Sequence, residues 1–286
     1  MKKAIIIILA AVISVLFVSC AEPSEKSGSS LPAQSQADTF RVPIIRYGSV
    51  TANDSLIGEN TCTLTQLESD IISLSEDGYS PVFVNDLIRY VKYDGTLPDR
   101  PVIMLIGETK LYCLSALLPL AQRYGWCFTA AISGSKTDSA PEDAAPEPER
   151  SYLGWEDITA LRNSGLFEFS ATAHDLLCDP ERINGGRRQS EDMRSYRRAF
   201  FADVLSLRER CYDNCLFKPN SFTFPAGTVS DDFITLANEC AFEAYITDDS
   251  GVSAIKKGDS SCLLTLKRID RSGYYDTDDL LAELAQ

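Results

Sequence analysis

The chain has 286 residues, of which 44% are hydrophobic and 24% are charged, and its formal net charge at pH 7 is −14. An acidic protein is repelled by phosphate backbones, so the composition excludes binding of nucleic acid, anionic lipid or anionic polymer through overall charge. The length and the apolar content suit one sizeable α/β domain.

The first 19 residues are typical of an export signal. Two lysines precede an apolar run over residues 4–18, which is too short for a membrane span of about 20 residues. The run ends in FVSC at residues 17–20, which resembles a bacterial lipobox, with cleavage before Cys20 and a lipid on its thiol. We predict a lipoprotein signal peptide over residues 1–19 and a protein anchored to the outer face of a bacterial cell membrane. An ordinary secretory signal with an incidental cysteine is the alternative.

A segment rich in Ser, Pro, Ala and Gln follows over residues 20–38. It has too little apolar area to fold, so we predict a disordered tether. Residues 39–286 then form the folded domain, in which the acidic, Pro-rich stretch 137–150 is predicted to be a surface insertion. The cysteines of this domain lie partly within apolar patterns, and we expect mostly free thiols.

Strand and helix patterns alternate through the first part of the domain. Arg41–Tyr47 has the length and apolar content of a strand. Thr63 opens a capping-box pattern for a helix that Gly78 ends. A brief strand over residues 81–84 and a helix capped by Asn85 follow.

The next stretch, PVIMLIGETK at residues 101–110, is typical of an interior parallel strand, because residues 102–106 are apolar without a break. In parallel α/β architectures, catalytic groups lie at the C-terminal ends of strands. Gly107 and Glu108 stand at that place. Only one carboxylate is therefore available where chemistry is expected.

The alternation continues to the end of the chain. We predict helices over 111–124, 155–164, 191–214, 231–240 and from 277 onward, and strands over 127–133, 167–172, 222–227, 244–247 and 263–269. About six or seven such repeats indicate parallel βα units in a barrel-like or open sheet.

Six motifs occur in a distinctive order: VPIIRYGSV, GYSPVFVNDL, LPDRPVIML, YLGWEDITALRNSGLFEFSAT, FTFPAG and LKRID. Through them, residues from about 40 to 286 resemble the polysaccharide deacetylases, the NodB-like carbohydrate esterases. The resemblance implies an α/β fold, a distorted (β/α) barrel of about seven parallel strands, with a glycan groove at the strand ends.

In the family that the chain resembles, one Asp and two His hold a divalent metal, usually zinc, which activates water and polarises the acetyl carbonyl. A second Asp acts as general base and a late His as general acid. Here Gly107 stands at the base position and Glu108 at the Asp ligand position, with Thr172 and Leu177 at the two His ligand positions. These replacements predict that neither a metal nor another cofactor is bound.

The chain has one histidine, His174, which lies between the two lost ligand positions and beside Asp175. It is either a structural loop residue or part of a rebuilt hydrolytic site with Glu108 and Asp175. The resemblance places Tyr47, Phe224, Pro225 and Arg268 in the substrate groove.

Arg268 matches an arginine that the family places near its base. The resemblance would pair this arginine with the base carboxylate, which Gly107 lacks. We therefore expect Arg268 to pair with Glu108.

Three functions are open at this point. The first is an exported, lipid-anchored deacetylase-like protein that has lost its metal site and binds envelope polysaccharide or peptidoglycan. The second is an active carbohydrate deacetylase with a rebuilt site around Glu108, His174 and Asp175. The third is a structural or partner-binding lipoprotein that docks through the acidic insertion or through the arginines between Arg182 and Arg198.

Overall fold

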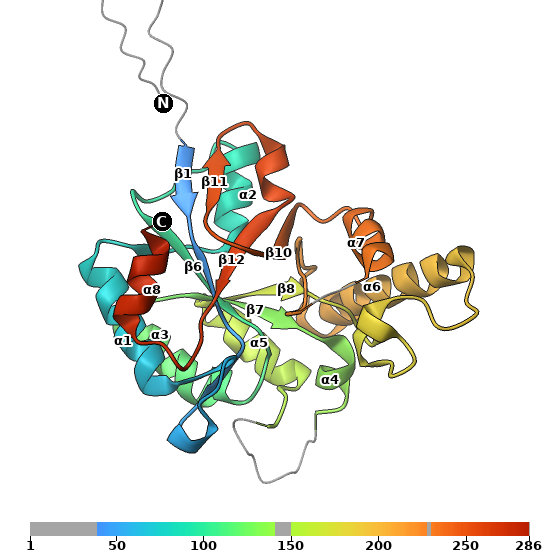
Figure 1. The fold of residues 1–286 in the computed structure, drawn as a ribbon, viewed down its shortest axis with the longest axis horizontal. Coiled ribbons are helices and arrows are strands. Elements are labelled where there is room, and N and C mark those ends of the chain that lie inside the picture. Colours follow the sequence, from blue (N-terminus) through green and yellow to red (C-terminus); the bar gives the residue numbers. More distant parts are fainter. Residues whose placement is uncertain (1–38, 141–149, 228–229, 286) are drawn as a thin grey trace, which may run out of the picture. The chain divides into compact units, whose positions relative to one another are not determined.

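Seven parallel strands form a closed barrel in the part of the chain that the structure describes (Figure 1). This computed structural model describes residues 39–140, 150–227 and 230–285, so the predicted signal peptide and tether lie outside the described residues. Around the barrel, the strands follow one another in the order β2 (Ile44–Tyr47), β12 (Leu266–Asp270), β10 (Ala244–Ser250), β9 (Ser221–Thr223), β8 (Phe167–Ala171), β7 (Phe128–Ile132) and β6 (Pro101–Ile106). Pairing of β2 with β6 closes the ring, which confirms the predicted barrel.

β6 is buried along its whole length, as predicted for the central strand. It pairs in parallel with β2 on one side and with β7 on the other. Its side chains point alternately into two different apolar clusters. Met104 packs in one cluster, and Ile103 packs in the other. The groups that follow β2, β6 and β7 are therefore brought to one rim of the barrel.

The first predicted strand is in fact two strands, because Pro43 interrupts it. β1 (Thr39–Val42) pairs antiparallel with β11 (Ser253–Lys256) outside the barrel, and β2 enters the barrel. Pro43 has no N–H to donate, but its carbonyl accepts a hydrogen bond from the N–H of Ile103 at 3.0 Å. The remaining short strands are β3 (Ser49–Thr51), β4 (Thr61–Thr63) and β5 (Ser80–Pro81).

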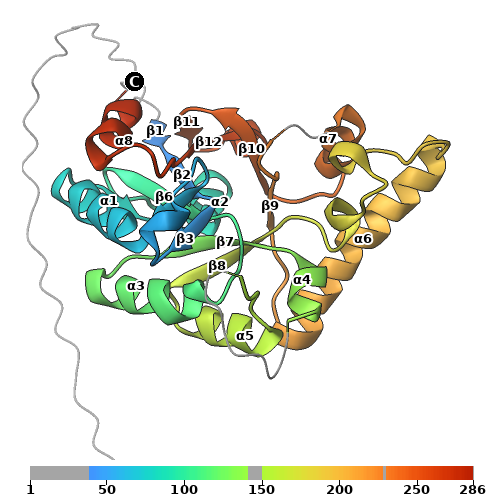
Figure 2. The ribbon, with the colours of Figure 1, turned by 60° about the horizontal axis from the view of Figure 1, so that its bottom comes forward.

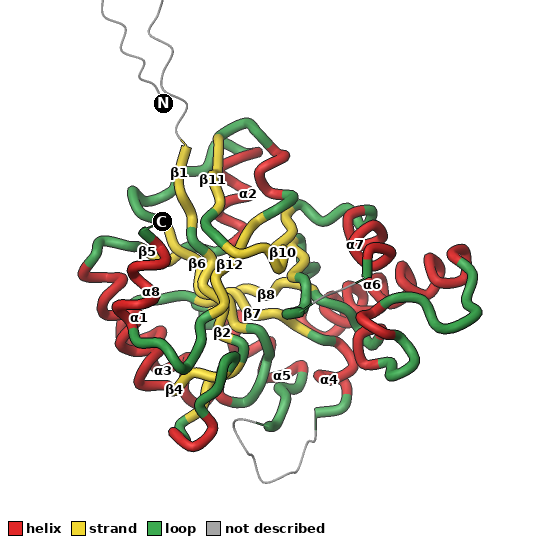
Figure 3. Tube along the Cα trace, viewed as in Figure 1, coloured by secondary structure: helices red, strands yellow, loops and turns green. Residues whose placement is uncertain are grey.

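Helices cover the outside of the barrel (Figures 2 and 3). They are α1 (Leu64–Glu76), α2 (Val84–Lys92), α3 (Leu118–Tyr124), α4 (Gly134–Asp138), α5 (Trp155–Asn163), α6 (Met193–Cys215), α7 (Asp231–Asn238) and α8 (Thr277–Leu284). A π-helical turn at Cys113–Leu117 precedes α3, and 3-10 turns lie at Asp54–Leu56, Leu176–Cys178, Ile183–Gly185 and Ser260–Leu263. α1 packs beside α8, and α5 packs beside α6.

The predicted capping box at Thr63 is present, and Gly78 follows α1 with a φ of 80°. The predicted insertion begins inside α4, and its residues 141–149 lie outside the described residues.

The cysteines between residues 62 and 262 are free in the structure. Within the described ranges, no helix has both the length and the apolar content that a membrane crossing needs.

The predicted N-cap of α2 is wrong. The helix begins before Asn85, and the carboxylate of Glu168 on β8 accepts hydrogen bonds from the N–H groups of Val84 at 2.6 Å and Asn85 at 3.3 Å. The hydroxyl of Thr129 donates to the same carboxylate at 2.8 Å. Burial raises the pKa of Glu168 to about 7 in spite of these hydrogen bonds. The cap comes from a distant strand, so local sequence did not indicate it.

This raised pKa predicts a pH dependence of stability. Glu168 binds its proton more tightly in the folded chain than in the unfolded chain, where the pKa is about 4.3. The folded state therefore holds more protons, and the free energy of unfolding falls as the pH rises from about 4.3 to about 7. The slope from this residue is at most about 1.4 kcal/mol per pH unit.

Denaturant unfolding of the wild type and of Glu168→Gln at pH 5, 6, 7 and 8 measures this effect. The glutamine still accepts from Val84 N–H but does not titrate, so we expect a flatter pH profile between pH 5 and 7. Parallel profiles for the two proteins would contradict the assignment.

Candidate functional site

A cleft of about 550 Å³ lies at the rim where the parallel strands end. Parallel barrels place their ligands at this rim, and the volume suits a small organic ligand. The residues that line the cleft include Arg46, Gly107, Glu108, Lys110, Lys136, Tyr152, Thr172, Leu177 and Pro225.

Glu108, the single carboxylate at the end of β6, is held by three neighbours. Its Oε2 lies 2.6 Å from Nζ of Lys110, and its Oε1 accepts a hydrogen bond from the hydroxyl of Tyr152 at 2.7 Å. Nζ of Lys136 lies 3.7 Å from the same Oε1. Burial alone would raise the pKa of Glu108, but the bonds from Lys110 and Tyr152 and the charge of Lys136 outweigh it and hold the pKa below its usual range. The carboxylate is therefore ionised, and the neighbouring lysines already compensate its negative charge.

Tyr152 connects the two lysines. It forms an antiparallel bridge with Lys110, which fixes its ring beside Glu108. Its hydroxyl accepts a hydrogen bond from Nζ of Lys136 at 2.7 Å while it donates to Glu108. Burial and the hydrogen bond to Glu108 raise the pKa of Tyr152, so the phenol stays protonated.

Arg46 occupies the space beside the predicted base position. A Cβ atom added to Gly107 would lie 2.9 Å from Nη2 and 3.1 Å from Nε of Arg46. Arg46 is 9% exposed, and its Nη1 lies 3.4 Å from Oδ1 of Asp270. The guanidinium thus takes the volume that a longer side chain at position 107 would need.

The expected pair between Arg268 and Glu108 is wrong. Arg268 is 1% exposed, and its guanidinium contacts Asp248 and donates to Oδ1 of Asp270 at 3.1 Å. It also donates to the backbone carbonyl of Phe224 at 2.6 Å. The guanidinium is satisfied by Asp248 on the adjacent strand β10 and by Asp270, which lies two residues after Arg268 on the same strand β12.

Three of the four predicted groove residues, Tyr47, Phe224 and Arg268, are buried and do not line the cleft. Tyr47 is fully buried, and its hydroxyl donates to Asp70 at 2.8 Å. Phe224 is buried against the rings of Phe222 and Phe233. Pro225 lines the cleft, at the turn that follows β9.

The structure does not bring His174 and Asp175 to Glu108. Nε2 of His174 lies 3.1 Å from Oδ2 of Asp138 on α4. The N–H groups of His174 and Asp175 both donate to the carboxylate of Asp203 on α6 at 2.7 Å. His174 and Asp175 therefore attach the loop after β8 to two helices and do not line the cleft.

The residues at the two His ligand positions offer no metal donor set. Oγ1 of Thr172 donates to the backbone carbonyl of Ile132 at 2.9 Å, and Leu177 brings only carbon atoms to the cleft. Within the described ranges, no group of three or more His, Cys, Asp or Glu side chains is arranged to hold a metal ion. Glu108 is bound by lysines, so the residues present do not fit the divalent metal that the resemblance implies.

The cleft residues that the sequence did not predict include Arg46, Lys136 and Tyr152. Arg46 is a charged residue inside the buried run IIRY, which was a usable signal, because a buried charge needs a partner or a role. Lys136 follows the end of β7 by a few residues, a position comparable to that of Glu108 after β6. Tyr152 carried no signal, because its neighbours in the cleft are far away in the chain.

Four of the six arginines between Arg182 and Arg198 form ion pairs with acids. Arg182 lies 2.7 Å from Glu191, and Arg188 lies 2.6 Å from Asp179. Two further pairs join Arg187 to Asp232 and Arg197 to Glu239. Four of the six charges are therefore compensated, so the cluster has little surplus charge for the docking surface of the third function.

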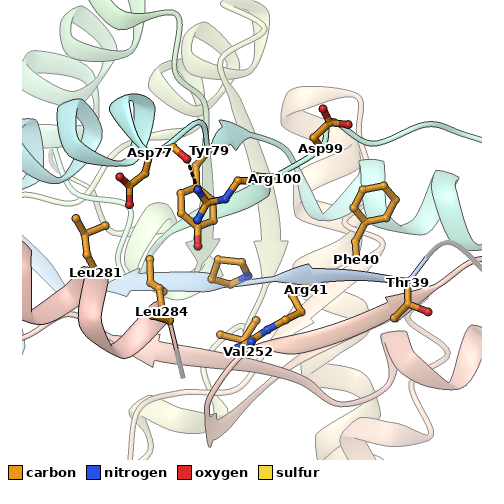
Figure 4. A pocket seen from close by; sticks show the side chains of 12 residues that line it. Thr39, Phe40, Arg41, Asp77, Tyr79, Asp99, Arg100, Val252, Leu281 and Leu284 are labelled. Carbon is orange, nitrogen blue, oxygen red and sulfur yellow. Dashed lines mark hydrogen bonds between the residues drawn. The ribbon is translucent and has the colours of Figure 1, made fainter.

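A second hollow, of about 490 Å³, lies at the opposite end of β6 (Figure 4). The guanidinium of Arg100 stacks over the ring of Tyr79 at 4.1 Å and donates to the backbone carbonyl of Asp77. Leu281 and Leu284 of α8 form its apolar wall. These groups satisfy one another, and this end of a parallel barrel is associated with stability rather than chemistry.

No protein-family model and no curated protein sequence matches the chain. Solved structures do match. A de-N-acetylase from Aggregatibacter actinomycetemcomitans superimposes with a TM-score of 0.70 at 17% identity, over 85% of this chain and 100% of that one. IcaB from Ammonifex degensii gives a TM-score of 0.67 at 14% identity, over 86% of this chain and 98% of that one.

A third match is the Streptococcus pyogenes deacetylase PplD in complex with acetate, with a TM-score of 0.64 at 12% identity, over 86% of this chain and 99% of that one. At these identities the comparisons establish the fold. The chain has the NodB-like barrel of the polysaccharide deacetylases, as the resemblance implied.

Proposed function

We propose that this chain is an exported, lipid-anchored, polysaccharide deacetylase-like protein that binds a glycan of the cell envelope and does not deacetylate it. The deacetylase fold and the cleft at the C-terminal rim of its barrel support glycan binding. The lipobox-like sequence ending at Cys20 supports the anchor, and incorporation of a labelled fatty acid that Cys20→Ser abolishes tests it.

The state of Glu108 carries the proposal. Its carboxylate is neutralised by Lys110 at 2.6 Å and hydrogen-bonded by Tyr152 at 2.7 Å. A divalent metal there would have to displace one cation and approach another, Lys136. Like charges in a partly buried site repel strongly, so the arrangement disfavours the metal.

Among the described residues, no group beside Glu108 replaces the missing base. Gly107 has no side chain, and the guanidinium of Arg46 next to it is a hydrogen-bond donor without an acceptor. The alternative site would need Glu108, His174 and Asp175 together, yet His174 and Asp175 are bound by Asp138 and Asp203 and do not line the cleft. No observation favours that alternative.

Two measurements on the full-length chain in detergent test the proposal. We expect far less than one zinc per chain after zinc is added and excess metal is removed. We also expect no acetate release from acetylated chitooligosaccharide or peptidoglycan above the level without protein. An active deacetylase serves as positive control. Stoichiometric zinc with acetate release that Glu108→Ala abolishes would overturn the proposal and restore an active enzyme.

A further inference from the structure

The cleft carries surplus positive charge in an otherwise acidic protein. The ion pairs at the rim form two groups. Arg46 and Arg268 pair with Asp270 and Asp248 and are balanced, whereas Lys110 and Lys136 share the single carboxylate of Glu108, which leaves a net charge of +1. We propose that the cleft binds one singly charged oxyanion, a carboxylate or a phosphodiester, carried by its glycan. This inference rests on the proposed function, because it names the ligand chemistry of the same cleft.

Arg46 is the first observation behind this inference. It lines the cleft at 9% exposure, and its Nη1 has no hydrogen-bond partner among the described residues. Asp270 at 3.4 Å provides charge without a hydrogen bond. An unsatisfied buried donor is destabilising, and more so when it is charged. An oxyanion in the cleft matches the planar guanidinium of Arg46 and adds negative charge beside it.

Lys136 is the second observation. Its side chain is 38% exposed, so it is accessible from the cleft. Its hydrogen bond goes to the hydroxyl of Tyr152 at 2.7 Å, and Glu108 at 3.7 Å is beyond ordinary hydrogen-bond distance. An ammonium has three donors, so Lys136 retains capacity for a ligand.

The neighbouring groups explain why an anion is preferred to a cation or a neutral sugar alone. Glu108 is the carboxylate that lines the cleft, and Lys110 and Tyr152 already occupy both of its oxygens. A cationic ligand would therefore be repelled by the lysines and would find no carboxylate oxygen in the cleft that is free to pair with it. In a cleft of about 550 Å³, the anion can be seated at Arg46 and Lys136 while the sugar ring occupies the remaining volume.

Calorimetric titration of the full-length chain in detergent tests this inference with three probes: trigalacturonate, its methyl ester and a trimer of glycerol phosphate. We expect at least one anionic probe to bind tenfold or more tightly than the ester at low salt, with an affinity that falls as salt rises. Tighter binding of trigalacturonate identifies carboxylate as the source of the charge, and tighter binding of glycerol phosphate identifies phosphodiester.

Lys136→Gln is the test variant, and Lys218→Gln is its control, because Lys218 is an exposed lysine outside the cleft. We expect the first to weaken binding of the anionic probe at least fivefold and the second to leave it unchanged. Equal affinity for acid and ester, no binding of either anionic probe, or equal effects of the two variants would overturn the inference. The proposed function is tested by zinc content and acetate release, which these binding measurements do not affect. A failure of this inference is therefore distinguishable from a failure of the proposed function.

Discussion

Replacing Asp70 by alanine lowers the free energy of unfolding by about 3–5 kcal/mol, because it leaves a buried arginine without its counter-charge. Asp70 on α1 is fully buried, and its Oδ2 accepts from Nε of Arg271 at 2.8 Å. The hydroxyls of Tyr47 and Thr277 donate to the same carboxylate at 2.8 Å and 2.6 Å. One carboxylate thus connects α1 to the end of β2, the residue after β12 and the start of α8. Denaturant unfolding measures the loss.

Glu76→Ala on the same helix is the matched control, because Glu76 is exposed and we expect a change within about 0.5 kcal/mol. The double variant Asp70→Ala/Arg271→Met removes both charges. It should be less destabilised than the sum of the two single variants, since no buried charge is left unpaired. Strict additivity would show that Asp70 acts through packing alone.

Replacing Gly273 by alanine is expected to destabilise the protein by about 2–4 kcal/mol, since overpacking against rigid backbone is costly. A Cβ atom at this position would lie 2.1 Å from the carbonyl oxygen of Thr61 and 3.0 Å from that of Gly58. The N–H of Gly273 also donates to the carbonyl of Gly58 at 3.0 Å. The variant would push away the loop that contributes Asn60 and Thr61 to the cleft wall. Thermal and denaturant unfolding measure the effect.

Gly58→Ala provides the control on the same loop. A Cβ atom there would approach nothing closer than the carbonyl of Leu56, at 4.0 Å. We expect a change within about 0.5 kcal/mol. If both glycine variants were equally stable, the close approach of Gly273 to Thr61 would have no energetic weight.

The barrel was predictable because its determinants are local. Apolar runs such as Pro101–Ile106 and the capping box at Thr63 are encoded within a few residues of the elements that they form. The errors concern features that depend on distant residues. The break at Pro43 is settled by pairing with β6 and β11, and the cap of α2 is Glu168, which lies 84 residues after Val84.

The sequence predicted where the site lies but not which residues surround Glu108. Gly107 and Glu108 were expected at the rim of the barrel, and the structure has them there. Lys110 is close to Glu108 in the chain, but Tyr152 was not foreseeable from spacing, because it is 44 residues away. Arg268 was assigned to the wrong carboxylate for the same reason. The sequence shows which acids exist, but only the fold shows which acid each cation reaches.

The position of β2 in the ring has a consequence for how the chain folds. β2 near the beginning of the described residues pairs with β12 near their end, as in the partners Ile45 and Ile269. The barrel therefore cannot close until residues 266–270 are available, and such long-range pairing folds slowly. A chain that ended before β12 would expose the edges of β2 and β10, and unpaired parallel edges associate with other chains. The last strand thus protects the first from aggregation.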